Sequence, residues 1–111
     1  MNTQHDFLSA WKHAIEVSQT PGLFYCSSRD ISSATNKDQL RPKVKDIRRK
    51  LVEYPKSRGA FLATLVSFYN PEEGASIARK LGVEGVGGLA INLNDEQRHA
   101  IAELFITHRG W

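Results

Sequence analysis

The chain has 111 residues, of which 41% are hydrophobic and 24% are charged, and a formal net charge of +3; these values are close to those of an average globular chain, and the length suits one domain. The single cysteine, Cys26, excludes an intramolecular disulfide, which fits a reducing compartment. Neither a secretory signal pattern nor an apolar run of roughly 18 residues is found, so we expect a cytoplasmic protein without a membrane span.

The first predicted helix covers residues 4 to 18. Thr3, with Asp6 three residues later, is typical of a helix start. Apolar residues then recur at helical spacing through Trp11 and Ile15. Pro21 and the glycine after it stop the helix.

Residues 19 to 37 form a long connection that the sequence does not resolve. The apolar run at 23 to 26 suits either an extended segment or a single helical turn. We expect Leu23, Phe24 and Ile31 to hold the connection against the core.

The second predicted helix covers residues 39 to 54. Its apolar residues follow one another at spacings of four, three and four, which is one face of a helix: Leu40, Val44, Ile47 and Leu51. Pro42 must lie near its start, because a proline deep inside a helix costs about 3 kcal/mol.

This helix carries the strongest charge feature of the chain. Six cations lie beside its apolar face: Arg41, Lys43, Lys45, Arg48, Arg49 and Lys50. Such a run is usually a solvated face, but here Asp46 is the only acid among them. We therefore predict a surface that binds phosphates or another acidic partner. No aromatic residue for base stacking is interleaved with the cations, so we do not expect sequence-specific reading of a single strand.

The third predicted helix, residues 57 to 70, is apolar on nearly every side and should be buried at the centre. Ser57 is its expected cap. Asn70 then caps a fourth helix, residues 71 to 81, with proline and two acids in its first turn and Gly82 at its end.

Gly85, Gly87 and Gly88 follow within four positions and predict a turn or a close backbone approach, with at most a short helix before Leu93. Asn94 and Gln97 form a capping pair for a last helix at 94 to 108. We expect Gly110 to end that helix, so that Trp111 packs back against Ile106.

Two short resemblances lie in the stretch 71 to 93. Residues 77 to 83, IARKLGV, resemble the first helix and turn of a helix-turn-helix, although a following recognition helix would present an acid and bare glycines. Residues 83 to 87, VEGVG, resemble the hairpin of helix-hairpin-helix modules, in which backbone N–H groups hold a phosphate. Close packing of helices explains the same glycines, and we favour that explanation.

The sequence thus predicts an all-α, single-domain bundle of about five helices around the helix 57 to 70. The four histidines and Cys26 lack metal-ligand spacing and an activating context, so we expect no metal, cofactor, small-molecule substrate or catalysis. The leading hypothesis is a binding protein that holds nucleic acid through the basic face. The alternatives are a protein adaptor or inhibitor with an acidic partner, and a DNA-binding regulator centred on 71 to 93. A homodimer, through 19 to 37 or the last helix, stays open.

Overall fold

The computed structural model describes residues 6–26 and 30–111, and the predicted cap at Thr3 lies outside them. In this part of the chain there are six α-helices, four short 3₁₀ helices and no strand. The α-helices are α1 (Phe7–Ser18), α2 (Val44–Lys50), α3 (Lys56–Tyr69), α4 (Pro71–Leu81), α5 (Gly85–Ala90) and α6 (Asp95–Thr107). The predicted all-α bundle is confirmed. No helix of the described residues is long and apolar enough to span a bilayer.

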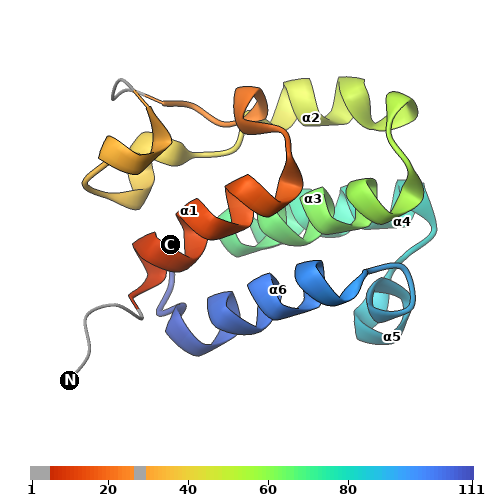
Figure 1. Ribbon diagram of the computed structural model, residues 1–111. Coiled ribbons are helices and arrows are strands. Elements are labelled where there is room, and N and C mark those ends of the chain that lie inside the picture. The colour runs from red at the N-terminus through yellow and green to blue at the C-terminus, as the bar shows by residue number, and fades with distance from the viewer. Residues whose placement is uncertain (1–5, 27–29) are drawn as a thin grey trace.

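Helix α3 is the centre of the core, as its sequence predicts. Nine of its residues are buried: Gly59, Ala60, Phe61, Leu62, Ala63, Thr64, Leu65, Val66 and Phe68. In Figure 1, α2 lies on one side of α1 and α3, while α5 and α6 lie on the other. Helices α1, α4, α5 and α6 all contact α3, so little of its circumference is left for water and its residues are apolar on nearly every side.

Helices α3 and α4 form a tight antiparallel hairpin. The Asn70 side chain accepts hydrogen bonds from Glu72 N and Glu73 N at 3.1 and 3.2 Å, so the predicted cap is confirmed. Gly82 ends α4 with φ of +73°, also as predicted. Between these ends the two backbones approach closely where Gly74 faces Ser67, since a Cβ on Gly74 would lie 2.4 Å from Ser67 Cβ.

The side chain of the C-terminal residue, Trp111, packs against three aromatic rings of α1 and α3. Its ring centroid lies 5.0 Å from that of Trp11, 5.7 Å from Phe7 and 5.1 Å from Tyr69. Its Nε1 donates a hydrogen bond to Asp38 Oδ1 at 3.0 Å. The predicted partner Ile106 is wrong, because that side chain is 64% exposed and α6 ends at Thr107, before an extended His108. Gly110 does have a positive φ, of 105°, but it turns the segment after the helix.

The predicted helix at 39 to 54 is wrong in its first third. Residues Lys37–Leu40 form the 3₁₀ helix η4, Arg41 is extended, Pro42 forms an isolated β-bridge, and α2 begins only at Val44. Pro42 causes the break, because its ring disfavours helical geometry in the preceding residue and it has no N–H for the helix ladder. After α2, Leu51–Glu53 continue as the 3₁₀ helix η5.

Other predicted boundaries shift by a few residues. Asp6 caps α1, with its carboxylate accepting from Ser9 N at 2.8 Å. Pro55, not Ser57, precedes α3, and the Ser57 hydroxyl instead donates to Gln97 Oε1 at 3.2 Å and ties α3 to α6. The capping pair of Asn94 and Gln97 is confirmed, with reciprocal bonds of 2.8 and 2.9 Å.

The described parts of the connection 19 to 37 contain two further 3₁₀ helices, η2 (Pro21–Leu23) and η3 (Ile31–Ser33). Leu23 and Phe24 are buried and Ile31 packs against the core, so all three predicted anchors are confirmed.

Candidate functional site

A short antiparallel bridge joins the end of η2 to the segment in front of α2. Phe24 pairs with Pro42. On either side of this pair, Tyr25 N donates to Arg41 O and Lys43 N donates to Leu23 O, both at 2.8 Å. Phe24 and Pro42 are a non-hydrogen-bonded pair of this antiparallel bridge, so the missing N–H of proline costs no hydrogen bond.

The alternation of extended backbone then decides which side chains face water. Successive residues point to opposite faces. Phe24 and Pro42 are buried, and the Phe24 ring meets the Trp11 ring edge-on at 5.9 Å. Their neighbours Arg41 and Tyr25 are therefore turned outward, and Lys43 is turned outward with them.

Two cations lie beside the Tyr25 ring. Arg41 Cζ is 5.3 Å and Lys43 Nζ 5.4 Å from its centroid, within the range of cation–π attraction. The ring is still 49% exposed. Each contact with an exposed aromatic is worth about 0.5–1 kcal/mol, which is enough to bias the side chains toward this arrangement.

These residues line a surface depression of about 460 Å³. Lys45, from the first turn of α2, adds a third cation, and Tyr69, from the end of α3, adds a second aromatic ring. We call Tyr25, Arg41, Lys43 and Lys45 the Tyr25 cluster. Among the residues that the structure describes, no carboxylate forms a salt bridge with its three cations. Asp46 also lines the depression, but its carboxylate pairs with Arg49.

The other three cations predicted for the basic face each have a carboxylate partner. Arg48 binds Glu73 of α4 at 2.5 Å, Arg49 pairs with Asp46, and Lys50 lies 3.5 Å from Glu53. The partner of Arg48 comes from another helix, so sequence spacing along the predicted helix could not show it. Within the part of the chain that the structure describes, the basic face predicted from Arg41 to Lys50 is thus split into a half without salt bridges and a neutralised half.

The glycines predicted to touch a phosphate do not join the cluster. Gly85, Gly87 and Gly88 belong to α5, which Figure 1 shows beside α6 and on the far side of α3 from α2. Gly85 has a φ of +81°, and a Cβ on Gly88 would lie 3.2 Å from the Val83 carbonyl. The short helix allowed for in this stretch is confirmed, and the close backbone approach occurs at Gly88.

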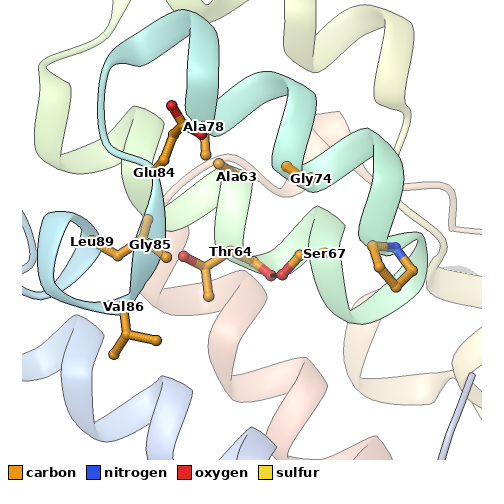
Figure 2. A pocket seen from close by; sticks show the side chains of 11 residues that line it. Ala63, Thr64, Ser67, Gly74, Ala78, Glu84, Gly85, Val86 and Leu89 are labelled. Atoms are coloured by element: carbon orange, nitrogen blue, oxygen red, sulfur yellow. Dashed lines mark hydrogen bonds between the residues drawn. The ribbon is translucent and has the colours of Figure 1, made fainter.

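A separate pocket of about 280 Å³ lies between α3, α4 and α5 (Figure 2). Thr64 and Ser67 reach it from α3, while Glu84, just before α5, and Gly85, the first residue of α5, lie on the other side. Much of the remaining lining consists of small apolar side chains. The negative charge of Glu84 would repel a phosphate here, so this pocket does not extend the Tyr25 cluster.

Sequence reasoning missed Tyr25, because no aromatic residue is interleaved with the cations along the chain. The signal was present but ambiguous: the apolar run 23 to 26, if extended, places one aromatic inside and the next outside. The partner segment 41 to 43 has the same in–out pattern around Pro42. The two segments form a site only because Phe24 pairs with Pro42, which lies 18 positions later in the sequence.

Titratable side chains of the described residues form no metal-binding group of three or more. His108 lies between the rings of Phe7 and Phe68, with centroids at 5.3 and 5.1 Å. Burial lowers its pKa, and the positive charge of Lys37 lowers that pKa further. This favours a neutral, packed histidine.

No family model matches the sequence, and neither a curated protein nor a solved structure matches it. The geometry of the Tyr25 cluster therefore carries the functional argument by itself.

Proposed function

We propose that the protein binds nucleic acid through the Tyr25 cluster and holds the phosphate backbone without reading its sequence. The observation that supports this most is the convergence of Arg41, Lys43 and Lys45 on one depression, without salt bridges to other described residues. A cation that has no carboxylate partner has no internal ion pair to break when it meets a phosphate. Its full charge is then available for counterion release.

The three cations differ in what they offer. The Arg41 guanidinium is a planar fork that can hold two phosphate oxygens at once, whereas Lys43 and Lys45 act as point charges. Tyr25 adds a phenolic hydroxyl that can donate to phosphate and a half-exposed ring for a sugar or a base. One half-exposed ring next to three cations is enough to bind a short stretch of nucleic-acid backbone.

The salt dependence of binding follows from the number of cations. Three phosphate contacts predict a slope of about −2.7 for log K against log salt on duplex DNA, and about −2.1 on a single strand. Affinity should then fall about 40-fold on a duplex, and about 20-fold on a single strand, when salt rises from roughly 50 to 200 mM. If all six predicted cations took part, the slope would be about twice as steep.

The test is fluorescence anisotropy with labelled single-stranded and duplex oligonucleotides of several sequences. Lys43→Glu should weaken binding about tenfold or more, since it removes one phosphate contact and adds a repulsion. The control is Lys80→Glu, an exposed change on α4 with the same effect on net charge, which should bind as the wild type does.

Two results would overturn the proposal. One is a wild-type protein that binds neither strand type at low salt, which would leave the acidic-protein alternative. The other is an equal loss of affinity in the two charge-reversal variants, because binding would then follow net charge and not the cluster.

A further inference from the structure

The depression at the Tyr25 cluster combines positive charge with aromatic and apolar surface. Two rings line it, those of Tyr25 and Tyr69. Pro42 and Val44 add apolar side chains beside the three cations. The volume of about 460 Å³ lies within the range of sites that take up one small molecule. This lining matches a nucleotide, because a nucleotide joins a base with flat faces to a charged phosphate.

The Tyr25 ring is the part of this lining that a base can reach. Tyr25 is nearly half exposed, whereas Tyr69 is more covered and its ring meets that of Trp111 edge-on at 5.1 Å. The hydrogen bond from Tyr25 N to Arg41 O, at 2.8 Å, fixes the backbone that carries the exposed ring. This backbone is therefore already ordered before a ligand arrives, which lowers the entropy cost of binding.

The two cations beside the ring can exchange it for phosphate. Arg41 Cζ and Lys43 Nζ lie 5.3 and 5.4 Å from the ring centroid, and the attraction between a cation and an exposed ring is weak. A phosphate oxygen offers each cation a stronger, charge-assisted hydrogen bond. When the cations turn to phosphates, the ring surface beside them becomes available to the neighbouring base. A stacking surface thus lies directly next to two phosphate contacts.

We propose that the Tyr25 cluster binds single-stranded nucleic acid in preference to duplex, with one base stacked on the Tyr25 ring. This inference rests on the proposed function and names the form of nucleic acid that the cluster binds. In a duplex, neighbouring base pairs cover the faces of each base, and only the base edges are accessible in the grooves. A duplex base reaches the ring only if it is flipped out, which costs its pairing and stacking.

A single strand does not have this cost. Its bases are unpaired, and every base has a face that can stack on an aromatic ring. The preference for single strands therefore brings no preference for sequence, in agreement with the proposed function.

An oligonucleotide without bases tests the stacking. The probes are three fluorescein-labelled DNAs with about eight phosphates each: a thymidine strand, a strand of abasic sites and a duplex hairpin. By fluorescence anisotropy, the wild type should bind the thymidine strand about 5- to 150-fold more tightly than the abasic strand, which is the gain expected from one stacked base.

Salt separates stacking from phosphate attraction. Stacking involves no counterion release, so the ratio between the thymidine and abasic strands should stay nearly constant from about 50 to 200 mM salt, while both affinities fall. The duplex affinity falls more steeply with salt. At about 200 mM salt the thymidine strand should therefore bind more tightly than the hairpin.

Protein variants assign the stacking to one ring. Tyr25→Ala should bind the thymidine and abasic strands about equally, and Tyr25→Phe, which keeps the ring, should keep the preference. The matched control is Tyr54→Ala, because Tyr54 also has a cation beside its ring, Arg58 Cζ at 5.3 Å, but lies after η5 and outside the depression. It should keep the wild-type preference. Circular dichroism verifies that each variant is helical, and the comparison of probes with the wild type needs no variant.

The inference is overturned if the wild type binds the abasic strand as tightly as the thymidine strand, or the hairpin at least as tightly at the higher salt. It is also overturned if Tyr25→Ala keeps the preference, or if Tyr25→Phe or Tyr54→Ala loses it. In each of these cases the proposed binding of phosphates would stand. A wild type that binds none of the probes would remove the proposed function and this inference together.

Discussion

Gly74 is the residue whose replacement tests the packing of the bundle most directly. It lies inside α4, where glycine is a poor helix former, so alanine would ordinarily stabilise the helix by about 1 kcal/mol. In this fold, however, an added Cβ would lie 2.4, 2.5 and 2.6 Å from Ser67 Cβ, Cα and N. Two of these atoms belong to the backbone of α3 and have no rotamer that avoids the contact.

The distances indicate the size of the effect. Carbon atoms pack at about 3.5–4.0 Å, so α4 must move away from α3 by about 1 Å to admit the methyl group. Overpacking of this kind costs about 1–3 kcal/mol, and here it also loosens the contacts of the buried α3. Subtracting the gain of about 1 kcal/mol in helix propensity leaves a range of about 0–2 kcal/mol. Because two of the contacted atoms are backbone, we expect Gly74→Ala to lower the free energy of unfolding by an amount at the upper end of that range, about 2 kcal/mol.

The assay is urea denaturation followed by circular dichroism at a helical wavelength. Gly87→Ala is the matched control, since an added Cβ there has no heavy atom within 4 Å and its φ is not positive. This control should raise the free energy of unfolding by up to about 1 kcal/mol. The reasoning is refuted if Gly74→Ala is as stable as the wild type, because α3 and α4 would then not be in the contact described.

Three further changes test other parts of the fold. Trp111→Ala removes the ring contacts and the hydrogen bond to Asp38, and should lower stability by about 2 kcal/mol in a urea titration; a thermal midpoint equal to that of the wild type would contradict this. Asn70→Ala leaves two N–H groups of α4 without their cap and should cost about 1 kcal/mol, whereas Asn70→Asp, which keeps an acceptor, should cost much less. Because the pKa of His108 is lowered in the fold, the unfolded chain binds more protons, so stability should be complete above the ordinary value of 6.5 and fall as pH drops from there to the lower folded value. His108→Gln should flatten the stability curve over that pH range, and an unchanged slope would show that another group titrates.

Local sequence patterns predict the helices well where capping residues and apolar spacing agree. Asn70 with Pro71, Gly82, and Asn94 with Gln97 each satisfy hydrogen bonds or backbone angles within a few residues, so α4 and the start of α6 follow from local chemistry. The apolar circumference of α3 likewise predicts its burial. The predicted helix at 39 to 54 shows where this fails: Leu40 and Ile47 are both buried, yet Pro42 separates them into two elements.

The predicted site changed more than the fold did. All six cations are visible in the sequence, and the carboxylate partners of Arg49 and Lys50 lie three residues away from them, but Glu73, which neutralises Arg48, belongs to another helix. Tyr25 reaches Arg41 and Lys43 only through the bridge between Phe24 and Pro42.

By itself, the sequence determined the helix content, the central position of α3, the main caps and the excess of cations. The tertiary structure decided that Glu73 neutralises Arg48 and that the Tyr25 ring lies beside Arg41 and Lys43. The physical reason is the distance along the chain over which each kind of interaction acts. Caps and helical periodicity are satisfied within about four residues, whereas an ion pair, a bridge between distant segments or an exposed face depends on which elements the folded core brings together.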